Sequence, residues 1–311
     1  SIAGISVSGI FVDADATGTV EAFIGAPLSR TPTSVPGSDL NIDGILTVGA
    51  YSDIYASAKS QGDGGGIFNV KALTADARVA GVTRAYIGEG ALVTAGTVNV
   101  LADGISEAYS EVSSIGVSLL NGTLALATST EEHLVEAFIG GEAGGSASEA
   151  TEVTATDGAI TVDAQLDSLS KSIGNLLGIG LLGAGSYADT TVTSTTTTRA
   201  YIGDEATVTG EHATAGDLVV TAKADVDALA DGTGTNLALG VGFSGARTRV
   251  TADPTVEAFS EGDVSINADD LKLEAIATVL ADADVELAAG GLLAGVAGGL
   301  ASAARRGRAV G

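Results

Sequence analysis

Small apolar and polar residues alternate along much of the chain, most clearly between residues 271 and 287. Apolar side chains occupy every odd-numbered position from Leu271 to Leu287, and charged residues such as Lys272 and Glu286 lie between them. A period of two places successive side chains on opposite faces of a β-strand, whereas a helix needs a period near 3.6. No segment has a convincing helical period, so the pattern predicts an all-β protein.

A short phrase recurs through the chain and divides it into repeats. It reads VEAFIG at 20–25, TRAYIG at 83–88, VEAFIG at 135–140, TRAYIG at 198–203, VEAFSE at 256–261 and a degenerate GRAVG at 307–311. The central alanines are 63, 52, 63, 58 and 51 residues apart, which gives about five degenerate repeats of about 57 residues. We divide this single array, residues 1–311, into a partial first unit 1–25 and units 26–88, 89–140, 141–203, 204–261 and 262–311.

Each unit has the same internal plan. A run such as TVNVLA or AITVDA leads into a long alternating stretch, and a Gly-rich apolar segment such as LALGVGFSG follows, which predicts a turn. A second stretch then leads back to the next recurring phrase. This plan predicts a parallel β-solenoid with one wide coil per unit. Two or three smaller rungs per unit, or a sandwich of long strands, are the alternatives.

The recurring phrase carries two series of residues that we expect to stack. The residue before its central alanine alternates in charge, in the order Glu21, Arg84, Glu136, Arg199, Glu257 and Arg308. An aromatic residue follows two positions later, in the order Phe23, Tyr86, Phe138, Tyr201 and Phe259. If units stack at the strand spacing of about 4.8 Å, opposite charges adjoin, and a slipped register loses every pair at once. The pattern therefore predicts that these residues fix the register between neighbouring strands, and ligand binding is the minor alternative.

The ends of the charge series bear on assembly. The series begins with Glu21 and ends with Arg308, so a second copy stacked head to tail would continue the alternation. We therefore expect the chain to associate with itself as a homopolymer, or with further repeats of a longer chain.

The repeats resemble those of a known group of proteins. Residues 84–102, RAYIGEGALVTAGTVNVLA, and a looser copy at 199–222 are similar to repeats of large bacterial surface proteins of the filamentous-adhesin-like and β-strand-repeat kinds. The resemblance covers almost the whole chain and rests on the style of the repeat, not on a catalytic signature. It implies a parallel β-solenoid, export to the bacterial cell surface and an adhesive or scaffolding role.

Composition and charge exclude several classes of partner. The net charge is −25 and the pI is about 4.1, which argues against nucleic acid and against anionic membrane surfaces. The absence of cysteine excludes disulfides and thiolate metal sites. Residues 287–304 are long enough and uncharged enough to suggest a membrane span. They consist mostly of Ala and Gly and fall where other units carry a Gly-rich turn, so we predict no membrane span.

Candidate chemistry is sparse. The two histidines, His133 and His212, lie in polar contexts typical of loops, and no G-x-S-x-G motif accompanies them. The acidic residues form no evident cluster of the kind that a polysaccharide-acting enzyme needs. A row of threonines at 190–198 offers ice binding as a minor alternative. We predict that the chain is not an enzyme and has no cofactor.

Calcium is the one ion that the acidic segments suggest. Carboxylates recur in short segments that match no calcium-binding motif, namely DADAT (13–17), QGDGGG (61–66), NADD (267–270) and ADADVE (281–286). Solvated acidic faces are the main interpretation of these segments, and Ca²⁺ bound at unit junctions is the alternative.

The sequence thus predicts a structural protein. We expect an extracellular filament, sheath or adhesin-stalk subunit that assembles by head-to-tail stacking. The alternative is a surface adhesin module that binds a glycan or cell-surface receptor through its faces or through an inserted loop such as 26–40, which holds Pro27, Pro32 and Pro36.

Overall fold

The computed structural model describes residues 4–28, 38–145, 147, 149–210, 217–305 and 308–310. Every regular element in this part of the chain is a strand, which confirms the all-β prediction. The strands are β1 (Ile5–Ile24), β2 (Ser38–Ile87), β3 (Ala91–Ile139), β4 (Thr151–Ala155), β5 (Ile160–Ser194), β6 (Thr197–Ile202), β7 (Ala206–Gly210), β8 (Leu218–Ala238), β9 (Val241–Ala252), β10 (Thr255–Ser260), β11 (Ser265–Asn267), β12 (Leu271–Gly291), β13 (Ala294–Arg305) and β14 (Arg308–Val310). No helix long and apolar enough to cross a membrane occurs among the described residues.

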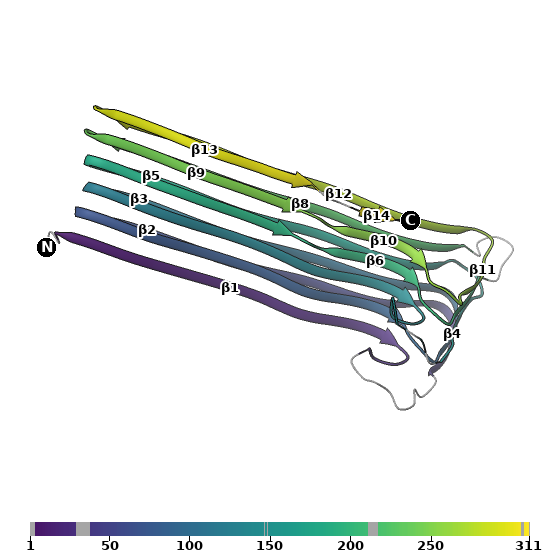
Figure 1. Ribbon diagram of the computed structural model, residues 1–311. Helices are drawn as coiled ribbons and strands as arrows, with labels where there is room; N and C mark the ends of the chain where they lie inside the picture. Colours follow the sequence, from purple (N-terminus) through teal and green to yellow (C-terminus); the bar gives the residue numbers. More distant parts are fainter. Residues whose placement is uncertain are drawn as a thin grey trace.

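All strand pairs are parallel and belong to one large, 14-stranded sheet (Figure 1). β1 lies beside the second half of β2, β2 pairs with β3 along nearly its whole length, and β3 pairs with β5. The central alanines mark the register, because Ala22 lies opposite Ala85, Ala85 opposite Ala137, Ala137 opposite Ala200 and Ala200 opposite Ala258. Each segment therefore lies beside the equivalent segment of the next predicted unit.

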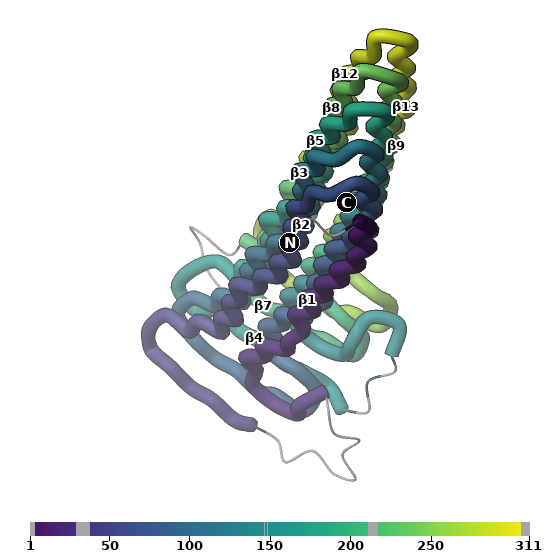
Figure 2. Tube along the Cα trace, turned by 90° about the vertical axis from the view of Figure 1, so that its left-hand side faces the viewer, coloured from purple at the N-terminus to yellow at the C-terminus, as the bar shows by residue number. Residues whose placement is uncertain are grey.

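The long strands fold back on themselves and form two facing layers. We call the first half of each fold the outgoing segment: residues 45–66, 98–118 and 160–180, β8 and β12. The return segments are β1, residues 68–87, 120–139 and 183–194 with β6, β9 with β10, and β13 with β14. Figure 2 shows the two layers as two columns, one with the outgoing segments of β2, β3 and β5 beside β8 and β12, and the other with the return segments, β1, β9 and β13 among them.

The Gly-rich segments form narrower reversals than the sequence predicts. In β3 the outgoing pairing continues to Ser118 and the return pairing resumes at Leu120. The residues on both sides of the reversal keep their ladder hydrogen bonds to the neighbouring strands, which is why the strand extends almost to the tip. We call this end of the molecule the tip. The opposite end, where the short strands β4, β7 and β11 add a third side, is the base (Figure 1).

The core near the base consists of small apolar residues stacked in columns. Val48, Val100, Val162 and Val220 lie opposite one another in successive outgoing segments, and all four are buried. Leu273 continues this column in β12 and is partly buried against the same cluster. The predicted inner face of residues 271–287 thus packs on the core.

Candidate functional site

Five aromatic rings form a continuous stack along the return layer near the base. Their order is Phe23, Tyr86, Phe138, Tyr201 and Phe259. Neighbouring ring centroids are 4.8–5.3 Å apart and the planes are within 11° of parallel. These distances follow from the strand spacing, since each ring stands at the same register position of the next strand. Each stacked pair contributes about 0.5–1.5 kcal/mol beyond the burial of its area.

The loops after the two VEAFIG phrases cover this stack. Leu28 and Ala143 pack against the rings, and their backbone N–H groups donate to the hydroxyls of Tyr86 (3.0 Å) and Tyr201 (3.1 Å). Both loops begin with a glycine in the left-handed region, Gly25 (φ 95°) and Gly140 (φ 104°) in chain order, and Gly permits this conformation without strain. As a result, Tyr86 and Tyr201 are fully buried although they lie outside the two-layer core.

The loop contacts explain why phenylalanine and tyrosine alternate. A long loop follows each VEAFIG phrase, and the tyrosine that bonds it belongs to the TRAYIG phrase of the next strand. Longer and shorter separations between successive central alanines, 63, 52, 63 and 58 residues, alternate for the same reason. The repeating structural unit therefore comprises two of the sequence units in this part of the chain.

The charged series forms a ladder of ion pairs beside the rings. Arg84 Nε donates to Glu136 Oε2 at 2.7 Å, and its guanidinium lies 3.7 Å from Glu21. Arg199 bridges Glu136 (3.7 Å) and Glu257 (3.0 Å) in the same way. The Glu136 side chain is almost completely buried between the two arginines. Breaking a buried ion pair on one side leaves an uncompensated charge, so the central pairs matter more than exposed pairs.

Arg308 does not take the place that the sequence suggested. In β14, Arg308 lies opposite Thr255, and Val310 lies opposite Glu257. Residues of β12 and β13 lie opposite the residues 53 positions earlier in β8 and β9, and β14 keeps this offset from β10. Alignment of GRAVG with VEAFSE would need an offset of 51, so the phrase is shifted by two residues. The many ladder bonds of those strands fix the register, and a three-residue strand follows it. The charge alternation therefore stops at Glu257 in the backbone register.

His133 is a second correction, because it lies in strand β3 and is buried, not in a loop. Its Nε2 is 3.0 Å from Thr83 Oγ1, and burial lowers the pKa of His133 to about 4. Glu131, two residues earlier, is also buried and accepts hydrogen bonds from the hydroxyls of Ser106 and Ser168. Burial raises the pKa of Glu131 to about 7, although these two bonds oppose the shift. His212 lies outside the described residues.

The acidic segments lie mostly on strands. DADAT belongs to β1, where Asp15 is 3.8 Å from Arg78, and Asp13 lies opposite Asp76. Burial and the charge of Asp13 raise the pKa of Asp76. Within the described ranges, no group of three or more His, Asp or Glu side chains could hold a metal ion. Calcium binding stays a prediction.

Sequence reasoning missed a group of buried polar residues near the tip. Lys71 is buried, and its Nζ donates to the carbonyls of Gly62 (2.9 Å) and Ile115 (2.7 Å). Burial lowers the pKa of Lys71, and the nearby charge of Asp63 opposes this shift. The period of two could have predicted this burial, because residues two positions apart on a strand share a face. Lys71 therefore shares the inner face with Leu73, and His133 shares it with Val135.

The ladders of charged and aromatic residues hold neighbouring strands in register. No protein-family model, curated protein or solved structure matches the chain.

Proposed function

We propose that the chain is a parallel β-solenoid in which one outgoing segment, one return segment and a short third side make each coil. The support is the register, since every pairing joins residues one predicted unit apart. The alternative of smaller rungs would pair residues within a unit, and the alternative of a sandwich would not advance regularly from unit to unit.

We further propose that this solenoid is a structural subunit of an extracellular filament, sheath or adhesin stalk, built by head-to-tail stacking. The observation that carries the proposal is that β1 and β13 leave an open parallel edge at the two ends of the return layer. Natural proteins usually shorten, charge or cover such edges. Here β1 exposes Ile5 (71%) and Val7 (76%), and no charged residue occurs in β13 before Arg305.

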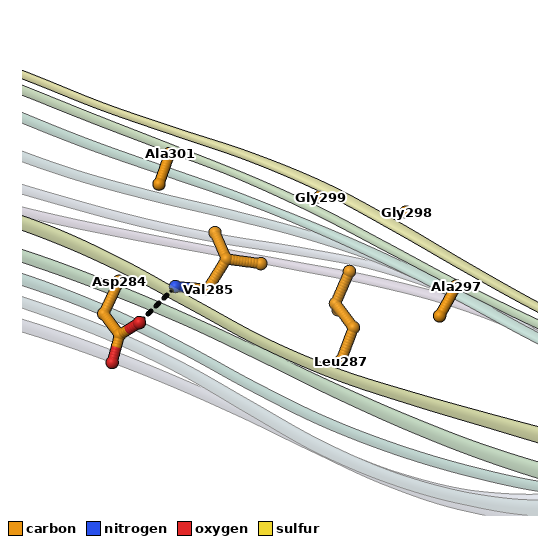
Figure 3. A pocket seen from close by; sticks show the side chains of 7 residues that line it. All are labelled: Asp284, Val285, Leu287, Ala297, Gly298, Gly299 and Ala301. Carbon is orange, nitrogen blue, oxygen red and sulfur yellow. Dashed lines mark hydrogen bonds between the residues drawn. The ribbon is translucent and has the colours of Figure 1, made fainter.

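The interior is also open at the β13 end. A hollow of about 460 Å³ lies between β12 and β13, and the side chains of Val285 and Leu287 point into it (Figure 3). In the central strands, the equivalent inner positions are buried by the next coil of the stack. A further coil on β12 and β13 would close this hollow.

The two ends are complementary because all strands are parallel. The free edge of β13 can pair with β1 of a second copy in the orientation that the whole sheet already has. Such a contact joins different surfaces and does not close on itself, so it generates a filament. Pairing of β13 with the next copy's β1 would continue the return layer.

The surface chemistry suits an extracellular location and the resemblance to bacterial adhesin-like repeats. A net charge of −25 keeps the charged outer faces near the base soluble and mutually repulsive, and the chain contains no cysteine to oxidise. Lateral sticking is thereby disfavoured relative to end-to-end growth. Binding of a glycan or receptor is the alternative, and its inserted loop 26–40 includes residues 29–37, which lie outside the described residues.

Electron microscopy of the purified chain over a range of concentrations tests the proposal. We expect filaments with an axial repeat of about 29 Å per copy, from six return segments at about 4.8 Å each. Ala301→Lys places a charge on the inner face of β13 and is expected to abolish filaments. Ala288→Lys adds the same charge on the outer face of β12 and is expected to leave them intact. Discrete rods at every concentration would contradict self-assembly and move the function to the loops.

A further inference from the structure

The polarity of the two faces changes between the base and the tip. Near the base, inner positions carry Val and Ala, and outer positions carry charged residues. Around the reversals no charge occurs over long stretches, which we call the arm: residues 4–12, 64–70, 112–130, 172–188, 232–246 and 287–304. Within the arm, buried polar side chains such as Asn69 and Asn121 point inward among apolar residues, and large apolar side chains such as Leu181 are exposed on the outside.

The inner face of the arm contains buried polar side chains, some of which hydrogen-bond to one another. Asn69 Nδ2 donates to Asn121 Oδ1 at 3.0 Å, and Asn236 Nδ2 donates to Ser244 Oγ at 3.2 Å. These side chains are buried, and glycines of the outgoing segments make room for them. A Cβ at Gly116 would collide with the amide of Asn121. The polar residues are therefore built into the interior and not left there by chance.

The outer face of the arm is apolar and exposed. Val117, Leu181, Leu239 and Phe243 come from three different reversals, and each is 49–59% exposed. A hollow of about 380 Å³ between neighbouring reversals is lined mainly by apolar side chains, Leu181 and Leu239 among them. A soluble protein rarely exposes a continuous apolar surface of this kind unless the surface meets an apolar partner.

We propose that the tip of the arm inserts into the hydrocarbon of one leaflet of a neutral lipid bilayer. A polar interior with an apolar exterior is favourable only where the surroundings are less polar than water. The depth also fits. Asp63 is the charged residue closest to a reversal on the outer faces, about four residues or roughly 13 Å from it. One leaflet of hydrocarbon is about 15 Å thick, half of the roughly 30 Å core.

The backbone at the reversals meets the requirement of a lipid environment. Leu239 N–H donates to Gly180 O at 3.3 Å, and Leu293 N–H donates to Gly240 O at 3.1 Å. These bonds join neighbouring reversals, as backbone groups in hydrocarbon require. The open edges of β1 and β13 meet this requirement only where a stacked copy pairs with them, so the inference rests on the proposed function. The net charge of −25 repels anionic headgroups, which is why the inference is restricted to neutral lipid.

A tryptophan reporter tests this inference, because the chain contains no tryptophan of its own. Leu239→Trp places the reporter on the arm. Ile105→Trp places it at an outer position of β3 with similar exposure, outside the arm and near Glu107. With phosphatidylcholine vesicles, we expect the Leu239→Trp emission to shift to shorter wavelength and to be quenched by brominated acyl chains. The Ile105→Trp emission is expected to stay unchanged.

Flotation with the same vesicles provides the second measurement. The double variant Leu181→Ser, Leu182→Ser removes two half-exposed apolar side chains and is expected to weaken vesicle partitioning by about tenfold or more. Vesicles rich in anionic lipid are expected to bind the unaltered chain more weakly. Equal spectral shifts at both reporter positions, or no shift at either, would overturn the proposal. A shift at Leu239→Trp that depends on protein concentration and not on vesicles would assign the arm to contacts between copies.

Discussion

Glu131 gives a sharp test of how the two layers bury charge. Its carboxylate lies inside β3 with Ser106 and Ser168 as hydrogen-bond donors, and burial raises its pKa from 4.5 to about 7. The charge of Glu107 also raises this pKa. In the unfolded chain the carboxyl ionises at its ordinary pKa, so the folded state binds the proton more tightly. The stabilising contribution is therefore complete below pH 4.5 and is lost as the pH rises through 7.

Glu131→Gln removes this dependence while it keeps the shape of the side chain. Between pH 5 and pH 8, the two pKa values imply a loss of roughly 2–3 kcal/mol in the unaltered protein. The free energy of unfolding of the variant minus that of the unaltered protein is therefore expected to rise by this amount between pH 5 and pH 8. His133 acts in the opposite direction, because its lowered pKa of about 4 costs stability as the pH falls below 6.5. The variant should therefore be most stable above pH 6.5.

Urea unfolding followed by circular dichroism at pH 5, 6, 7 and 8 measures the effect. Glu132→Gln is the matched control, since Glu132 is exposed and pairs with Arg78 on the outer face. We expect the free energy of unfolding of this control to follow the unaltered protein across the pH range. If Glu131→Gln and the unaltered protein had parallel pH profiles, the carboxyl would not be buried as described, and the packing of the two layers would be wrong.

Three further predictions concern the ladders and the arm. Phe138→Ala leaves a cavity between two stacked rings and is expected to cost about 3–5 kcal/mol in urea unfolding, whereas Phe23→Ala at the exposed end of the stack should cost less. Glu136→Gln removes the buried charge between two arginines and should cost about 1–3 kcal/mol, with a smaller difference at high salt. Gly116→Ala should cost about 1–3 kcal/mol, because the added methyl group meets a buried amide. Gly122→Ala, where the nearest atom is 4.0 Å away, is the control and should cost less than half as much.

The recurring phrase predicted which residues lie side by side, and the period of two predicted strands. These two features act locally, since a recurring phrase places equivalent residues in adjacent strands and the pleat fixes the alternation. The placement of Arg308 could not be predicted in this way. The phrase GRAVG is short and contributes few ladder bonds. The many ladder bonds of β12 and β13 therefore decide the register.

The sequence did not indicate which loops would fold over the rings. The hydroxyls of Tyr86 and Tyr201 receive backbone N–H groups 58 residues away in the chain, and no local pattern encodes such a contact. His133 looked loop-like because its neighbours are polar. His133 shares a strand face with Val135, two positions later, which indicated an inner position. Whether a histidine there is buried depends on the residues of the facing layer.

Spacing along the chain is enough to establish that this protein is made of strands, which residues share a face and which strands are neighbours. Which face lies inside depends on contacts between residues that are far apart in the sequence. In most of the protein the apolar face is covered by the second layer, but in the arm the layers meet through Asn69, Asn121 and Asn236, and Leu181 and Leu239 remain outside. Both arrangements satisfy the same alternation. The choice between them depends on how glycines and asparagines of facing segments fit together across the two layers.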